Sequence, residues 1–351
     1  MPRFKKLTVK EIIKETENAV SIAFNIPNEL KDEFKFIAGQ YITVRITLEG
    51  KEIRRSYSIC SSPENTEFRV AVKEVQNGIF SNYATKKLKV GDVLEVSPPE
   101  GKFILQTATS HQKNYAAFAA GSGITPVISM IKSVLLKETH STFVLVYGNK
   151  SAKETIFKDE IDALKIRYSE RFFVQYVFSK KIIDSAILGR IDKSMVNLII
   201  KNKFKNTVFD DFYLCGPEEM IDTVTATLKE NNIPLSKIHF ELFTSTYTSG
   251  AITSKNLDGN TTITVLLDDE ETTFEMSKKK LILTAALDEG LDAPYSCQGG
   301  ICSSCIARVT EGGVVMDKNS ILSEDEVNEG LILTCQAHPT TDKITINFDD
   351  V

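Results

Sequence analysis

The sequence contains no apolar run long enough to cross a membrane. A membrane-spanning helix needs roughly 18 or more consecutive apolar residues, whereas the longest apolar stretch, residues 116–136, is interrupted by polar residues and a proline. The basic start of the chain, residues 1–6, lacks the apolar core of a secretion signal. These absences predict a soluble, cytoplasmic protein with no membrane insertion.

Cysteine is also scarce, with 6 in 351 residues. Small secreted domains held together by disulfides carry a much higher cysteine density, so a disulfide framework is not expected. No basic stripe with interleaved aromatic residues marks a nucleic-acid-binding surface. No internal repeat or low-complexity tract is present either, and the composition is that of an ordinary globular protein.

Charge is distributed unevenly along the chain. Residues 259–351 contain 17 acidic and 6 basic residues, a net charge of −11, whereas residues 1–258 carry a net charge of +6. An acidic C-terminal part suggests electrostatic docking with a basic partner or with the rest of the chain. An acidic surface that only faces solvent is the alternative.

The length predicts two or three domains, and the apolar patterns divide the chain accordingly. Closely spaced short strands in residues 1–108 predict an antiparallel β-barrel with one short helix from Ser81 to Leu88. Alternating strands and helices in residues 109–243 predict an α/β domain with a doubly wound parallel sheet. Residues 244–258 look like a linker, and residues 259–351 are consistent with an α+β domain of the β-grasp type.

The most specific pattern is the C-x4-C-x2-C spacing of Cys297, Cys302 and Cys305, which is followed much later by Cys335. This is the spacing of plant-type [2Fe–2S] centres, which are held by four thiolates. The glycines at 299–300 let a tight loop bend over the cluster and turn N–H groups toward the sulfur atoms. Structural zinc is the alternative, although it more often takes cysteines in closely spaced pairs.

A flavin site is suggested by two features of the barrel. On an expected strand, Arg55 offers a fork of donors for a pyrophosphate, Tyr57 a ring to stack on a flavin, and Ser58 a hydroxyl for the flavin N5 edge. Further along, Gly78 leads into the short helix, with Ser81 as a capping residue, which is a suitable phosphate site. An ordinary strand and an ordinary helix cap are the alternatives for each feature alone.

A nucleotide site is suggested in the second domain. An apolar strand is followed by a glycine loop and a helix with proline expected at its first position, the setting that holds a dinucleotide pyrophosphate. A second element follows a later strand at the carboxyl edge of the sheet, where a small cysteine side chain could lie beside a nicotinamide. The residues singled out are Gly121, Gly123, Thr125, Pro126, Cys215, Gly216 and Pro217.

The residues expected near the 2′ position of the nucleotide favour NADPH over NADH. An acidic residue after the second strand of the sheet would favour NADH. This sequence instead has Lys150 there and Ser179-Lys180 after the next strand, which suit a 2′-phosphate. Surface lysines are common, so NADH stays open.

Together these features resemble the ferredoxin–NADP reductase superfamily fused to a C-terminal plant-type ferredoxin domain. The domain order looks most like that of the reductase components of phenylacetyl-CoA epoxidase and related ring-hydroxylating systems. The resemblance covers nearly the whole chain, and residues 238–243 resemble the end of the nucleotide domain, with Phe243 expected over the flavin face. It implies that the flavin and barrel residues named above bind FAD, the glycine-loop and Cys-Gly-Pro residues bind the nicotinamide nucleotide, and the four cysteines bind the cluster.

The predicted function is an NAD(P)H-dependent oxidoreductase that moves electrons from NADPH through FAD to a [2Fe–2S] cluster. A terminal oxygenase or another acceptor protein receives them. Tyr57, Ser58 and Cys215 are the predicted catalytic residues, although the cofactors carry most of the chemistry. Two alternatives remain: an FMN- and NADH-dependent dioxygenase reductase, and a non-enzymatic module with a structural zinc site.

Overall fold

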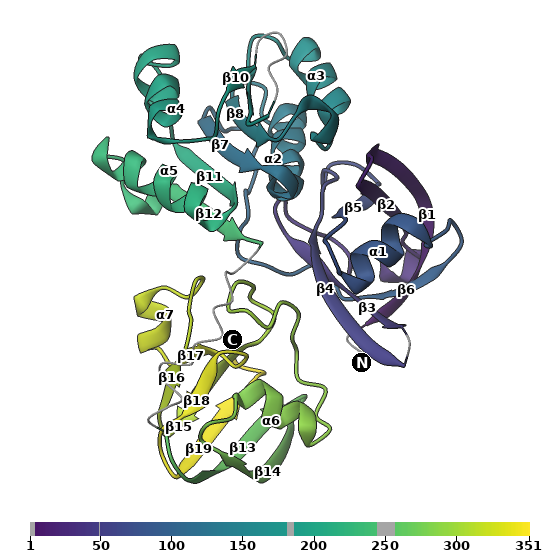
Figure 1. Ribbon diagram of the computed structural model, residues 1–351, viewed down its shortest axis with the longest axis vertical. Helices are drawn as coiled ribbons and strands as arrows, with labels where there is room; N and C mark the ends of the chain where they lie inside the picture. Colours follow the sequence, from purple (N-terminus) through teal and green to yellow (C-terminus); the bar gives the residue numbers. More distant parts are fainter. Residues whose placement is uncertain (1–3, 49, 181–185, 244–256) are drawn as a thin grey trace. The chain divides into compact units, whose positions relative to one another are not determined.

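The computed structural model describes residues 4–48, 50–180, 186–243 and 257–351. They belong to two compact units, residues 1–243 and residues 244–351 (Figure 1). Most of the expected linker, residues 244–256, lies outside the described residues. None of the helices in the described ranges is both long and apolar enough to span a membrane.

The first part of the chain forms the antiparallel sheet of the predicted barrel, in the order β4-β3-β6-β1-β2-β5. Alternate residues face an apolar core that includes Leu7, Ile22, Ile42 and Val70. Most of β1 beyond Val9 is exposed, which is why its apolar pattern did not identify it as a strand. The elements are β1 (Lys5–Thr16), β2 (Ala19–Asn25), β3 (Tyr41–Leu48), β4 (Lys51–Ser58), β5 (Phe68–Lys73), α1 (Ile79–Lys86) and β6 (Val93–Val96).

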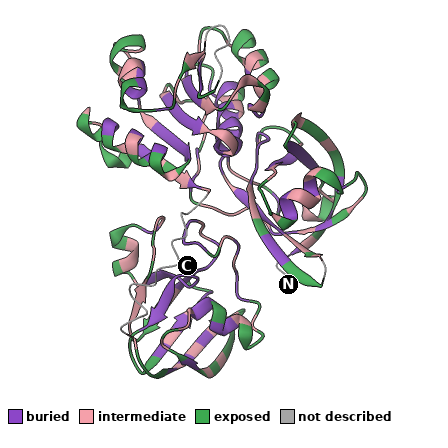
Figure 2. Ribbon diagram, viewed as in Figure 1, coloured by how far each residue is buried: buried purple, intermediate pink, exposed green. Residues whose placement is uncertain are grey.

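The remainder of the first unit contains the predicted doubly wound sheet, in the order β10-β9-β8-β7-β11-β12. Neighbouring strands run parallel throughout this order, and the central strands are buried along most of their length (Figure 2). Strands read as nearly continuous apolar runs because helices cover such a sheet. The elements are β7 (Asn114–Ala120), α2 (Ile124–Lys137), β8 (Thr142–Asn149), α3 (Lys158–Arg167), β9 (Phe172–Phe178), β10 (Ile187–Leu188), α4 (Lys193–Asn197), β11 (Asp211–Gly216), α5 (Glu218–Glu230) and β12 (Ile238–Leu242).

The starts of α1 and α2 differ from the sequence predictions. The helix expected from Ser81 begins at Ile79, so Ser81 lies in its first turn and Gly78 takes the N-cap position. Pro126 is the third residue of α2, which begins at Ile124 after a 3₁₀ turn. A proline is tolerated there because the first four N–H groups of an α-helix have no partner within the helix.

The second unit contains a mixed sheet in the order β14-β13-β19-β15-β17, against which α6 packs Ile282, Leu283 and Ala286. This α+β arrangement confirms the predicted class. A separate ribbon of β16 and β18 was not predicted. The elements are β13 (Asn260–Leu267), β14 (Glu270–Ser277), α6 (Ile282–Asp288), β15 (Ile306–Glu311), β16 (Val314–Met316), α7 (Glu324–Asn328), β17 (Leu331–Leu333), β18 (Ala337–Pro339) and β19 (Lys343–Asn347).

Candidate functional site

The loop between α6 and β15 contains three of the four predicted cluster ligands. The fourth, Cys335, follows β17, and the pairing of β17 with β15 brings it back to this loop. Two neighbours of Cys335 hold the segments together: the Thr334 hydroxyl donates to the Cys305 carbonyl at 2.9 Å, and the Gln336 amide donates to the Gln298 carbonyl at 3.1 Å. The pairing of these strands therefore places the fourth cysteine close to the other three in space, although it is far from them in sequence.

The four thiols interact with one another in pairs. Cys297 interacts with Cys302 and with Cys335, and Cys305 interacts with Cys335. Within the described ranges, no three Cys, His, Asp or Glu side chains surround one common metal position. A binuclear cluster matches a chain of pairwise contacts, because each iron takes two protein thiolates.

Backbone N–H groups of the cysteine loop point toward the Cys297 sulfur. The Gly299 N–H donates to the Cys297 sulfur at 3.3 Å. The interactions with Cys302 and Cys335, together with the N–H groups of Gly299 and Ile301, lower the pKa of Cys297 against the opposing effect of burial. A thiol that loses its proton readily is the form that binds iron.

Gly300 has a second, steric reason to be glycine. Its φ is +71°, and a Cβ there would lie 3.0 Å from the Gln336 side chain and 3.1 Å from the Lys318 carbonyl. The chemistry of the donor set and the shape of the loop thus fit a [2Fe–2S] cluster held by Cys297, Cys302, Cys305 and Cys335.

Strand β4 presents the predicted flavin residues. The Arg55 guanidinium donates to the Arg54 carbonyl at 2.7 Å. The Tyr57 ring lies with its centroid 5.4 Å from that of Phe80 on α1, and burial raises the pKa of its phenol. Tyr57 is therefore held beside α1 as a neutral ring suited to stacking.

The turn from Gly78 into α1 is folded by the Ser81 side chain. The Ser81 hydroxyl accepts from the Val75 N–H at 3.1 Å and lies 3.4 Å from the Gly78 carbonyl. A Cβ at Gly78 would lie 2.4 Å from the Ser81 oxygen. Since Ser81 is engaged in the turn itself, the N–H groups at the start of α1 are the donors offered to a phosphate.

The predicted nucleotide residues meet at the carboxyl edge of the parallel sheet. The Gly121–Gly123 turn ends β7, and Cys215-Gly216 ends the adjacent β11. A Cβ at Gly123 would lie 2.1 Å from the Cys215 carbonyl oxygen, so only glycine allows this approach. Thr125 donates to the Ser122 carbonyl at 3.0 Å and completes the turn.

Glu241 is a site residue that the sequence analysis did not identify. It pairs with Cys215 across β11 and β12, and its carboxylate accepts a hydrogen bond of 3.4 Å from the Ser58 hydroxyl. Desolvation raises the pKa of Glu241 to about 8, and Glu241 in turn raises the pKa of the buried Cys215 thiol, in addition to burial. Strand register thus joins the predicted catalytic Ser58 and Cys215 through a carboxyl group that can hold a proton at neutral pH.

Lys73 is a second residue that the sequence analysis missed. It ends barrel strand β5, and its ammonium would lie 3.8 Å from a Cβ at Gly121. Burial, followed by the charge of Lys150, lowers the pKa of Lys73. Lys150 and Ser179 are neighbours, because the chain segments after β8 and β9 remain hydrogen-bonded to one another. Positive charge from both domains therefore gathers near the glycine loop.

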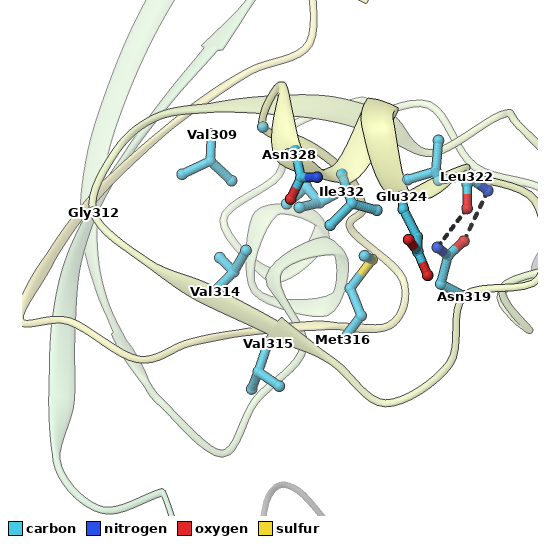
Figure 3. A pocket seen from close by; sticks show the side chains of 12 residues that line it. Val309, Gly312, Val314, Val315, Met316, Asn319, Leu322, Glu324, Asn328 and Ile332 are labelled. Carbon is cyan, nitrogen blue, oxygen red and sulfur yellow. Dashed lines mark hydrogen bonds between the residues drawn. The ribbon is translucent and has the colours of Figure 1, made fainter.

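A further cavity lies in the second unit, with a volume of about 680 Å³. Val314 and Met316 of β16 extend toward Ile332 and Asn328, whereas Val315 points away (Figure 3). The acidic helix α7 borders this cavity and exposes Glu324. The site is an apolar hollow beside negative charge.

Family models match three parts of the chain. Residues 6–104 match an oxidoreductase FAD-binding domain, residues 118–226 an oxidoreductase NAD-binding domain, and residues 265–340 a 2Fe-2S iron–sulfur cluster binding domain. The three matches follow one another in the order expected from the sequence. The FAD, nucleotide and cluster predictions are therefore confirmed at the level of domains, while the individual site residues stay predictions.

Relatives match over the full length. A 1,2-phenylacetyl-CoA epoxidase component from Escherichia coli (strain K12) is 36% identical over 99% of both chains. The ferredoxin reductase component of 3-ketosteroid-9-alpha-monooxygenase from Rhodococcus rhodochrous is 34% identical, covering 97% of this chain and 96% of that one. The structure of phthalate dioxygenase reductase superposes with a TM-score of 0.61 over 98% of both chains at 24% identity, which supports the fold.

Proposed function

Because the chain belongs to the family of ferredoxin reductase components of oxygenases, we propose that a separate terminal oxygenase receives its electrons. The chain is an oxidoreductase with FAD-binding, NAD-binding and [2Fe–2S]-binding domains. The observation that carries the proposal is that one polypeptide contains both arrangements. Four thiols interact with one another in pairs, and elsewhere Ser58 is hydrogen-bonded to Glu241, which pairs with Cys215. One polypeptide thus contains a site for two-electron chemistry and a site for one-electron transfer.

The residues of this chain bind and orient the cofactors. Bound FAD would supply the conversion between two-electron chemistry with the nicotinamide and one-electron transfer to the cluster. Arg55 supplies donors to the flavin pyrophosphate, and Tyr57 supplies the stacking surface. Ser58 and Glu241 form a hydrogen-bonded pair next to Cys215, and the Glu241 carboxyl can hold a proton there, beside the proposed flavin site. These roles are proposals derived from position and chemistry.

NADPH is the proposed electron donor. Lys150 and Ser179 lie together at the ends of β8 and β9, and Lys73 adds a further positive charge beside the glycine loop. A 2′-phosphate carries the negative charge that these groups favour. We also propose the cytoplasm as the compartment, because its reducing conditions keep thiols such as those of Cys60 and Cys215 reduced.

The acceptor is proposed to dock on residues 257–351 through charge. Glu324 lies beside the apolar cavity (Figure 3). Such an acidic surface with a hollow fits a basic surface that carries one protruding apolar side chain. An oxygenase of the phenylacetyl-CoA epoxidase type is the first acceptor to test, since the Escherichia coli relative named for that enzyme matches 99% of both chains.

An anaerobic absorption titration of the purified protein tests the proposal. Flavin and iron–sulfur bands that both bleach, with half-saturation at a lower concentration of NADPH than of NADH, are the expected result. A protein that contains zinc in place of iron and sulfide, or that takes up no FAD, contradicts it. Equal or lower half-saturation with NADH contradicts only the choice of nucleotide.

A further inference from the structure

Helix α2 links the two predicted cofactor sites of the first unit. It begins at Ile124, directly after the Gly121–Gly123 turn of the nucleotide site. Its middle packs against residues 60–64, the segment that follows the flavin strand β4 after Ser58. One helix therefore touches the nucleotide loop at one end and the continuation of the flavin strand along its side.

The contacts between α2 and residues 60–64 are polar and buried. Ser129 and Ser133 are fully buried on α2, and so is Ser62 in the facing segment. Side chains three and four residues apart lie on one face of a helix, so Ser129, Lys132 and Ser133 form a single row. The contacts are Ser129 Oγ donating to the Ser61 carbonyl at 2.6 Å, Lys132 Nζ donating to the Cys60 carbonyl at 3.0 Å, and the Ser133 and Ser62 hydroxyls at 3.2 Å.

Close apolar packing also joins α2 to the barrel. Gly39 of the barrel has a φ of +104°, and a Cβ there would lie 2.6 Å from the Met130 methyl and 2.0 Å from the Phe103 carbonyl oxygen. The barrel backbone thus approaches α2 as closely as a glycine permits. This contact fixes the separation of the two elements, while the hydrogen bonds fix their register.

The C-terminal end of α2 is tied as well. Lys137 pairs with Glu64 at 3.0 Å. The buried Glu138, which follows the helix, accepts from the Ala108 N–H at 3.2 Å and lies 2.8 Å from the His111 ring. These two partners of Glu138 are in the segment that connects the barrel to the parallel sheet, and a third, the Tyr115 hydroxyl, donates from β7 at 3.1 Å. The helix is therefore attached to the barrel from its middle to its end.

We propose that α2 sets the distance between the nicotinamide and the flavin, with Ser129, Lys132 and Ser133 as positioning residues for hydride transfer. This inference rests on the proposed function, in which the nucleotide lies at the glycine loop and the flavin at β4. A displacement of a reacting group by about 1 Å can slow a reaction by about 100-fold. Hydrogen bonds resist sliding along the helix axis better than apolar contacts do, because they depend on direction.

The test compares two variants with a matched control. Ser129→Ala combined with Ser133→Ala removes two hydroxyls from the row, and Lys132→Met removes the ammonium. Thr223→Ala is the control, because the Thr223 hydroxyl donates within α5, to the Glu219 carbonyl at 2.8 Å. Stopped-flow measurements give the rate constant of flavin reduction, normalised to bound flavin. The donor is either ordinary NADPH or NADPH deuterated at the transferred position.

The expected result is a rate constant lowered about tenfold in each variant, with the dissociation constant of NADP⁺ changed by less than about twofold. The deuterium isotope effect on flavin reduction increases, since hydride transfer becomes more strongly rate-limiting. Hydrogen–deuterium exchange of residues 60–64 increases too, which is a readout independent of activity. The Thr223→Ala protein behaves as the unmodified one.

Unchanged reduction per bound flavin in both variants overturns the inference, because a merely structural row would lower stability and not the rate. A rate loss explained wholly by weaker NADP⁺ binding also overturns it. If the double serine variant does not fold, Lys132→Met decides alone, with Lys132→Arg expected to recover part of the rate. Failure of the proposed function is distinguished by the unmodified protein, whose flavin would then be reduced by neither NADPH nor NADH.

Discussion

In residues 257–351, the candidate site consists of one loop and one cysteine that a neighbouring strand brings back to it. In residues 4–243, the candidate site is assembled from the ends of many strands. Ser58 ends β4, Cys215 lies near the end of β11 and Glu241 near the end of β12. The first kind of site depends on local spacing, and the second depends on strand order and register.

The comparison extends to charge and burial. The cluster loop lies in a strongly acidic part of the chain, whereas the flavin and nucleotide sites lie in a part with net positive charge. Contacts with Cys302 and Cys335, together with backbone N–H groups, lower the pKa of Cys297, whereas burial raises the pKa of Glu241. The pKa values of a local site thus depend on the backbone of its own loop, and those of an assembled site depend on how far its strands exclude water.

Removal of one cluster thiol gives the largest expected effect and tests whether the local site is independent. Cys302→Ser is expected to lower NADPH-driven reduction of cytochrome c, taken as a one-electron acceptor at the cluster, by more than about tenfold, because iron is lost with its ligand. Reduction of ferricyanide by the flavin is expected to change little. Cys60→Ala, which removes a thiol outside the loop, keeps iron and sulfide. Equal loss of both activities would show that the cluster only supports the fold.

The carboxyl of Glu241 predicts a pH-dependent stability for the assembled site. Its pKa in the folded protein is about 8, above the ordinary value of 4.5. The folded state therefore keeps a proton that the unfolded chain has lost, so this contribution to stability is complete below pH 4.5 and is lost as pH rises through 8. The free energy of unfolding is expected to fall by about 1–3 kcal/mol over that window, less than the full shift because Glu241 is partly exposed.

Urea unfolding of the apoprotein at several pH values measures this effect. Glu241→Gln is expected to remove the decline between pH 5 and pH 8. Glu170→Gln, which changes an exposed carboxylate in the same domain, keeps it. A slope that Glu241→Gln leaves intact would assign the pH dependence to other groups.

The nucleotide preference sharpens the comparison further. Lys150→Met is expected to raise KM for NADPH about tenfold, equivalent to about 1.4 kcal/mol, while KM for NADH stays within about twofold. Lys153→Met, at a nearby lysine on the following turn, serves as the control. Steady-state ferricyanide reduction with both nucleotides measures it. A parallel rise for NADH would place Lys150 at the pyrophosphate and not at the 2′-phosphate.

A change in salt concentration gives the smallest expected effect, and it tests the difference in charge between the two regions. Raising ionic strength from about 0.05 M to about 0.5 M is expected to slow cytochrome c reduction several-fold, because the screening length shortens. The deuterium isotope effect on flavin reduction, measured at saturating NADPH, is expected to stay constant. Cytochrome c reduction that is independent of salt would contradict docking through the acidic surface.

The cluster-binding and nucleotide-binding domains could be predicted from sequence because the predicted cluster ligands and the glycine loop have short, characteristic spacings. Cys297, Cys302 and Cys305 lie within a span of nine residues, and the predicted fourth ligand, Cys335, follows after 29 intervening residues. The strand and helix alternation of the parallel sheet was predicted for the same reason, since apolar period is a local property.

Glu241 and Lys73 could not be predicted in this way. Glu241 becomes a site residue through its parallel register with Cys215, and Lys73 through the meeting of β5 with the glycine loop. Neither relation produces a recognisable spacing of residues in the sequence. The placement of Ser81 was wrong for a related reason, because the helix N-cap depends on the backbone of Gly78, which local composition does not determine.

All four predicted cluster cysteines lie within residues 297–335, and this has a consequence for recombination. A crossover within residues 244–256 keeps the complete ligand set on one side, so a ferredoxin part from a relative could be exchanged as one inherited block. A crossover between β6 and β7 would instead separate Ser61 from Ser129 and Gly39 from Met130. Barrel and nucleotide domain are therefore expected to be inherited together, and chimeric reductases are best joined after Phe243.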